Sequence, residues 1–153
     1  LIRFKEDEIR MMGRTASGVR GIDVGEGIAV GMEVTSTESE NVLVVTENGY
    51  GKKTTIDQYR MTHRGSKGVK ALNVTEKNGN IVSFKIVNGD EDLIIITDSG
   101  MIIRLSLSQV SSTGRVAQGV KLINLKDNQK VSTIAVIEHE EQQEEIEENN
   151  ENN

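Results

Sequence analysis

Apolar residues along this chain occur in short runs separated by polar turns, a pattern typical of β-strands. A run over 42–46 is followed by an Asn-Gly turn and a second expected strand over 50–56. A third strand is expected over 69–74, and a fourth over 81–87 follows another Asn-Gly turn. Asn-Gly between apolar segments favours a hairpin, because glycine adopts the positive φ of the turn without steric cost. The pattern therefore predicts an all-β chain.

The same pattern returns about every 50 residues. Residues 42–49 align with residues 93–100 at an offset of 51. The clearest repeated motif is Arg-x-x-x-Gly-Val followed by Lys or Arg, which occurs over 14–20, 64–70 and 115–121. Agreement of three such motifs at nearly constant spacing indicates a repeat architecture.

Each repeat is expected to form one four-stranded blade of a β-pinwheel or propeller-like fold. By analogy with the middle repeat, the last repeat should have strands over 93–97, 101–105, 119–125 and 131–137. The expected repeat units are about 1–41, 42–92 and 93–137, which gives about three blades. The first blade is incomplete, because 1–4 aligns approximately with 101–104 and the preceding apolar strand is missing. Three blades cannot close a ring, so we interpret the chain as part of a longer protein cut inside a blade. Closure by self-association is the alternative.

Composition favours a cytoplasmic protein with an aliphatic core. Hydrophobic residues make up 35% of the chain but aromatic residues only 3%, and proline and cysteine are absent. Without cysteine there is no disulfide framework, which fits a reducing compartment. The longest apolar runs, such as 93–96, are strand-sized and far from the roughly 18 residues that a membrane span requires. We expect no membrane association.

Charge divides the chain into a body and a tail. The whole chain carries a net charge of −6, but 8 of its 24 acidic residues lie in 138–153, which has no Lys or Arg. The remaining residues, 1–137, hold 18 basic and 16 acidic side chains and are therefore mildly basic. The tail has almost no apolar residues and is expected to be disordered. It is either a solubilising extension or an intramolecular DNA mimic that competes for the basic body.

Each Arg-x-x-x-Gly-Val loop places a cation beside glycine. Glycine lets the backbone approach a phosphate closely, and the planar guanidinium of arginine matches phosphate oxygens. Because the unit repeats, we expect these cations to line up along a common outer edge. Duplex DNA could bend over such an edge without any reading of its bases. The expected phosphate contacts are Arg14, Arg20, Lys52, Lys53, Arg64, Lys67, Lys70, Arg104, Arg115 and Lys121.

Two other interpretations of these cations remain open. Any single Lys or Arg could belong to an ordinary solvated surface, although such a surface has no reason to repeat its cations in register. Arg14, Arg64 and Arg115 could instead tie each loop to backbone carbonyls of the neighbouring blade. The repeat supports the phosphate role and this structural role equally.

No catalytic or metal-binding constellation can be argued from the sequence. The segment 49–52 has glycines and a lysine but lacks the spacing of a phosphate-binding loop. Tyr50 and Tyr59 have no activating base or carboxylate cluster near them in the sequence, and we expect them to be packing or rim residues. His63 and His139 are too few and too far apart for a metal site. The chain is expected to have no active site and no cofactor of its own.

Several segments resemble the C-terminal domain of the A subunit of bacterial DNA gyrase. They are VVTENGYGKKT (44–54), MTHRGSKGVKALNVTEKNG (61–79), VNGDEDLIIITDSGMIIR (87–104) and GRTASGVRGI (13–22). The resemblance covers nearly everything but the tail and rests on several motifs in the right order. The family's hallmark is the box Gln-Arg-Arg-Gly-Gly-Lys-Gly in its first blade. The segment most similar to this box, Thr-His-Arg-Gly-Ser-Lys-Gly at 62–68, departs from it and is interpreted as a later blade's version of the loop.

The resemblance implies a six-bladed β-pinwheel that wraps double-stranded DNA around its outer edge, with this chain as roughly the second half. It also implies the partners, which are the rest of the gyrase A protein and the gyrase B protein in an A2B2 complex. ATP and Mg²⁺ would be used by that complex for negative supercoiling, in the cytoplasm and on the nucleoid. The alternatives are the corresponding domain of the A subunit of topoisomerase IV and a propeller-type protein-interaction scaffold with incidental basic residues.

Overall fold

The computed structural model describes residues 1–37 and 40–139. Within them lie seven strands: β1 (Asn41–Thr46), β2 (Tyr50–Thr55), β3 (Ile81–Val87), β4 (Asp92–Thr97), β5 (Ile102–Ser106), β6 (Val120–Lys121) and β7 (Val131–Ile137). The helical elements in this part of the chain are three single 3-10 turns: η1 (Glu6–Glu8), η2 (Ile56–Gln58) and η3 (Leu107–Gln109). The predicted all-β fold class is confirmed.

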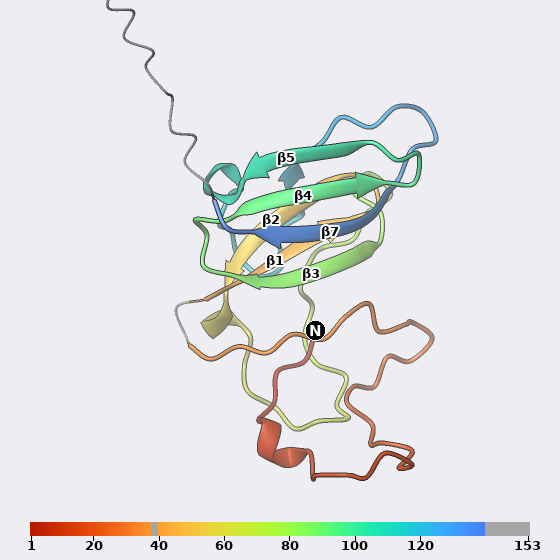
Figure 1. Ribbon diagram of the computed structural model, residues 1–153, viewed down its shortest axis with the longest axis vertical. Coiled ribbons are helices and arrows are strands. Elements are labelled where there is room, and N and C mark those ends of the chain that lie inside the picture. Colours follow the sequence, from red (N-terminus) through yellow and green to blue (C-terminus); the bar gives the residue numbers. More distant parts are fainter. Residues whose placement is uncertain (38–39, 140–153) are drawn as a thin grey trace, which may run out of the picture.

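The strands form two antiparallel sheets, with the orders β3-β1-β2-β6 and β5-β4-β7 (Figure 1). In each sheet the first strand of a repeat lies between the second and the fourth. The two sheets even share an irregularity, because the register shifts between Val45 and Thr46 in one and between Ile96 and Thr97 in the other. The sequence repeat is therefore a structural repeat.

An aliphatic core joins the two sheets, as the composition suggested. Leu43 and Val45 on one face of β1 pack with Leu93 and Ile95 of β4, and all four are fully buried. The opposite face of β1 packs against a second cluster, which includes Tyr59, Leu72 and the partly buried Leu1. The middle repeat is thus covered on both sides by its neighbours, and it is the structural centre of the chain.

The first repeat is irregular over 1–37. Apart from η1, its only regular feature is an isolated parallel bridge between Arg3 and Met61. Figure 1 shows this segment in red and orange below the sheets, beside the yellow-green loops of the middle repeat. Ile28 and Met32 are more than 80% exposed there. At offsets of 50 and 51, the residues equivalent to Met32 are Val82 in β3 and Thr133 in β7, and both of these strands pair with a first strand.

The expected third strand of each repeat is wrong in length and in place. Residues 69–74 form no strand, and of 119–125 only the two residues of β6 do. The reason is that this segment bonds to the preceding repeat instead of its own. The Val69 amide donates to the Leu1 carbonyl at 2.8 Å, and Val120 lies opposite Gly51 of β2. The sheet of the middle repeat is therefore completed by β6 of the following repeat.

The acidic tail was expected from 138 onward. Within the described residues, β7 ends at Ile137, and His139 Nδ1 lies 2.8 Å from Asp92 Oδ1. Beside His139 and the guanidinium of Arg104, the pKa of Asp92 is lowered. Residues 140–153, and with them the two interpretations of the tail, lie outside the described residues.

Candidate nucleic-acid interface

The three Arg-x-x-x-Gly-Val loops lie in a row, which we call the loop row and define as residues 14–20, 64–70 and 115–121. Repeated backbone hydrogen bonds hold them in order. The Asp23 amide, just after the first loop, donates to the Ser66 carbonyl of the second at 3.0 Å. At the equivalent position, the Asn73 amide donates to the Ala117 carbonyl of the third at 3.3 Å. The same bond made twice places consecutive loops side by side in the same orientation.

Arginine side chains connect the loops. Arg64 donates from Nε to the Glu8 carbonyl at 3.0 Å and from a terminal nitrogen to the Arg20 carbonyl at 3.3 Å. One repeat later, Arg115 donates from a terminal nitrogen to the Lys70 carbonyl. Arg64 and Arg115 thus have the structural role that the sequence left open, since each ties its loop to the preceding repeat. Both remain partly exposed, so their charge still adds to the potential of the row.

The glycines of the loops approach protein backbone, and this corrects the expectation that they clear space for a phosphate. Gly68 and Gly119 have φ of +73° and +80°. A Cβ on Gly68 would lie 2.2 Å from the Leu1 carbonyl oxygen, and one on Gly119 would lie 2.7 Å from that of Gly51. Gly18, with φ of +83°, has nothing within 4 Å of the equivalent position. Gly68 and Gly119 are needed because the loop backbone lies directly on Leu1 and on Gly51 of β2, whereas Gly18 has no such contact.

The loop row carries exposed cations at equivalent positions of its three loops. Arg20, Lys70 and Lys121 occupy equivalent positions, directly after the Gly-Val pair, and all three are exposed. Arg14 and Lys67 are exposed on the same loops. Among the described residues, salt bridges to carboxylates are made by Lys and Arg side chains outside the loop row. They join Lys85 to Glu33, Arg104 to Asp92, and Lys130 to Glu47. The row therefore presents positive charge that salt bridges within the described chain do not neutralise.

The prediction that Lys52 and Lys53 contact phosphate is wrong, because both side chains point into the protein. Lys52 has no exposed surface, and its ammonium donates to the Gly114 and Arg115 carbonyls at 2.6 Å each. Desolvation, with a smaller effect of the nearby Arg115 charge, lowers its pKa to about 8. Lys53 is 9% exposed and donates to the Leu107 carbonyl at 2.7 Å. Their hydrogen bonds hold the third repeat against the middle one.

Arg3 does for the first repeat what Lys53 does for the middle one, and the sequence reasoning did not recognise it. It donates to the Ile56 carbonyl at 3.3 Å, which is equivalent to the Leu107 carbonyl that Lys53 reaches. The signal was present, since Arg3 aligns with Arg104 and hence with Lys53. Arg104 stands at this tie position in the last repeat, on β5, and its Nε donates to Asp92 at 2.6 Å. The structure does not place Arg104 in the loop row.

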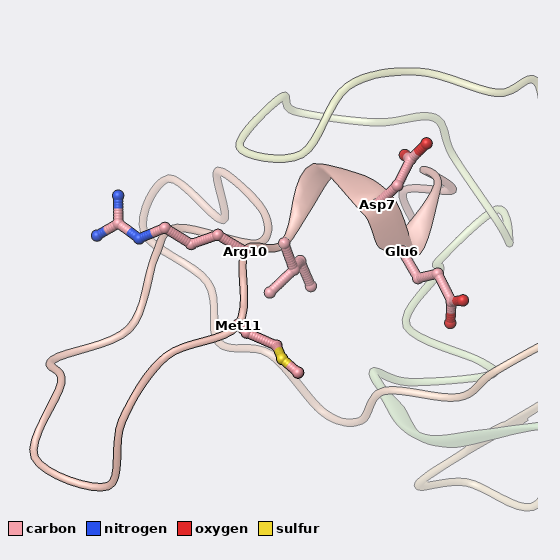
Figure 2. Close-up of a pocket in the computed structure, with 5 residues that line it drawn as sticks. Glu6, Asp7, Arg10 and Met11 are labelled. Carbon is pink, nitrogen blue, oxygen red and sulfur yellow. The ribbon is translucent and has the colours of Figure 1, made fainter.

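Other parts of the described chain offer no competing site. Figure 2 shows a shallow hollow beside η1, where Arg10 points away from Glu6 and Asp7, so no polar groups converge there. Residues 1–37 and 40–139 contain no group of three His, Cys, Asp or Glu side chains that could hold a metal ion. No helix in the same residues is long and apolar enough to cross a membrane. The loop row is the candidate interface.

Comparison with known proteins assigns the family. The family described as DNA gyrase C-terminal domain, beta-propeller, matches residues 1–36, 40–88 and 91–138. The chain belongs to the DNA gyrase C-terminal domain family. Its relatives include the DNA gyrase A subunits of Staphylococcus epidermidis, 52% identical over 143 residues, and of Staphylococcus aureus, 51% identical over 142. Each alignment covers 92% of this chain but 16% of the relative, so this gyrase-family chain spans a small part of the proteins it matches.

Solved structures of related domains share the fold. A DNA gyrase A C-terminal domain matches with a TM-score of 0.76 and 25% identity, over 88% of this chain and 46% of that one. The C-terminal domain of a DNA topoisomerase IV matches with a TM-score of 0.83 and 23% identity, over 88% and 42%. The second match concerns the fold alone. The gyrase C-terminal domain assignment rests on the family match and on the high identity to gyrase A subunits.

Proposed function

We propose that this chain binds double-stranded DNA along the loop row and helps to wrap it, as part of the A subunit of a DNA gyrase. The observation that carries the proposal is the twice-repeated backbone bond that sets the three loops side by side. It gives Arg20, Lys70 and Lys121 equivalent, exposed positions along one edge. Membership of the gyrase C-terminal domain family supports the same role.

The physical basis is charge matching to the DNA backbone. Duplex DNA carries one negative charge per about 1.7 Å of its axis, and each phosphate that a cation neutralises releases condensed counterions. Bending a short duplex costs on the order of 1–6 kcal/mol, which one surface contact cannot supply. Several cations repeated in register can offset that cost together. No base needs to be read, which suits a row built from lysine, arginine and backbone.

The reaction itself is assigned to the whole assembly. In this proposal the rest of the gyrase A protein and the gyrase B protein, in an A2B2 complex, carry out ATP-driven negative supercoiling as a type II topoisomerase in the cytoplasm, on the nucleoid. The described residues hold no carboxylate or histidine group fit for Mg²⁺, so we derive no step through Mg²⁺ or ATP in this chain. The contribution of this chain is to bind and direct the DNA.

A salt titration tests the proposal. We expect the double variant Arg20→Gln/Lys70→Gln to bind duplex DNA more weakly, with a slope of log affinity against log salt reduced by about 1.8, or 0.9 for each lost contact. Fluorescence anisotropy with a labelled duplex of mixed sequence, between about 50 and 200 mM salt, measures this slope. The matched control, Lys85→Gln/Lys126→Gln, removes equal charge outside the loop row and should keep the slope of the unmodified chain.

Two results would contradict the proposal. If the unmodified chain fails to bind duplex DNA even at low salt, the protein-interaction scaffold becomes the better interpretation. If both double variants lower the slope equally, binding depends on total charge and not on the loop row.

A further inference from the structure

Two lysines flank one aromatic ring at the junction of the middle and last repeats. Tyr50 opens β2 and lies opposite Lys121 of β6. The Lys77 ammonium lies 5.6 Å from the centroid of the Tyr50 ring, and the Lys121 ammonium lies 5.9 Å from it. Both lysines are exposed, whereas Tyr50 is half-buried. Lys121 belongs to the loop row, and Lys77 lies outside it.

The turn that carries Lys77 is fixed to its surroundings. Asn78, which is 1% exposed, donates to the Asn73 carbonyl at 2.9 Å and to the Gln118 carbonyl at 3.2 Å. The Asn48 side chain donates to the Lys77 carbonyl at 3.1 Å. Because Gln118 lies on the third loop, these bonds hold the backbone of Lys77 in place relative to the loop that carries Lys121.

The salt bridges among the described residues do not include Lys77 or Lys121. The nearby carboxylate of Glu47 accepts a hydrogen bond from the Asn80 amide at 2.8 Å and pairs with Lys130 at 3.7 Å. The Tyr50 ring attracts each ammonium through its negative face, which favours the placement of both lysines at this ring. Both ammonium groups contact one ring, and each is a mobile point charge with three donors that suits a phosphate oxygen.

We propose that Lys77 and Lys121, positioned by the Tyr50 ring, form a phosphate-binding site for the DNA backbone that extends the loop row at this junction. This inference rests on the proposed function, because it assumes that DNA follows the loop row. At the equivalent positions in the last repeat, Met101 replaces Tyr50 and Asn128 replaces Lys77.

Single substitutions in the whole chain test the site. We expect Lys77→Gln to lower the salt slope of DNA binding by about 0.9 and the affinity at about 0.1 M salt by about five- to tenfold. Lys126→Gln is the matched control, because Lys126 is exposed in the equivalent turn of the last repeat but shares its hollow with Asp98 and Asp127. It should leave the slope unchanged.

The role of Tyr50 as a positioning residue has its own readout. Tyr50→Phe keeps the ring and should bind DNA as the unmodified chain does, whereas Tyr50→Leu should weaken binding severalfold at low salt. Equal urea midpoints for the Phe and Leu variants would show that folding does not cause the difference. Equal DNA affinities for the two variants would overturn the role of the ring.

The outcomes separate this inference from the proposed function. A titration of Lys77→Gln that superimposes on that of the unmodified chain, while Lys70→Gln still weakens binding, overturns the Lys77 site and leaves the loop row in place. If neither substitution changes binding, the loop row fails and the inference fails with it.

Discussion

Gly119→Ala is expected to destabilise the chain by about 3–4 kcal/mol, measured as the loss in free energy of unfolding in urea by far-ultraviolet circular dichroism. A left-handed conformation costs an alanine about 1–2 kcal/mol. The added methyl group would also lie 2.7 Å from the Gly51 carbonyl oxygen, so the backbones of β6 and β2 must separate. The methyl carbon and the carbonyl oxygen are both fixed to backbone and cannot move aside as the end of a flexible side chain could. The clash therefore adds to the backbone strain.

Gly18→Ala is the matched control for this prediction. Gly18 has the same place in its motif and nearly the same φ, +83°, but an added methyl group would meet nothing within 4 Å. It should cost only the conformational strain, about 1–2 kcal/mol. If both substitutions cost the same, contact with the preceding repeat contributes nothing, and the close approach of repeats is not what requires glycine.

The free energy of unfolding should depend on pH through the Lys52 ammonium. Its pKa in the folded chain is about 8, below the ordinary value of 10.5. Between these values the unfolded chain binds the proton more tightly, so stability rises with pH across this window. The rise should be on the order of 3 kcal/mol, which is the free-energy equivalent of this shift. A neutral amine still has two hydrogens for the Gly114 and Arg115 carbonyls, so the hydrogen bonds can persist.

The measurement is the free energy of unfolding in urea at several pH values between about 8 and 10.5. Burial raises the pKa of Tyr59, so Tyr59 makes its own contribution to the pH dependence of stability. The informative quantity is therefore the difference between the unmodified chain and Lys52→Met, which lacks the titrating group. Lys70→Met, at an exposed position, should keep the full rise. Identical pH dependence in all three proteins would contradict the assignment to Lys52.

Strands that pair within their own repeat were predictable from the sequence. The apolar run of β1, the glycine turn after it and the same pattern one repeat later in β4 and β5 are local signals. The strand predicted after Gly68 is absent. The backbone of Val69 bonds to Leu1, a partner 68 residues away in the preceding repeat, which local sequence cannot indicate. Ala71 and Leu72 in this segment are nevertheless buried, whereas Val74 is exposed.

The exposed cations of the candidate site were predictable from their place in the repeated motif. Arg20, Lys70 and Lys121 share one motif position and one exposed environment. Lys52 was misassigned because alternation along a strand cannot show that neighbouring repeats cover both of its faces. A comparison of the repeats would have warned of this, since Ile2 and Ile103 occupy the positions equivalent to Lys52.

The placement of β6 on the sheet of the preceding repeat also bears on how the chain opens. Tyr50 and Gly51 pair with Lys121 and Val120, so loss of order in the last repeat exposes backbone groups of the middle one. In native-state hydrogen exchange, amides along this seam should report the opening of the following repeat as well as their own. Folding units and sequence units are therefore out of phase, and neighbouring repeats gain and lose protection together.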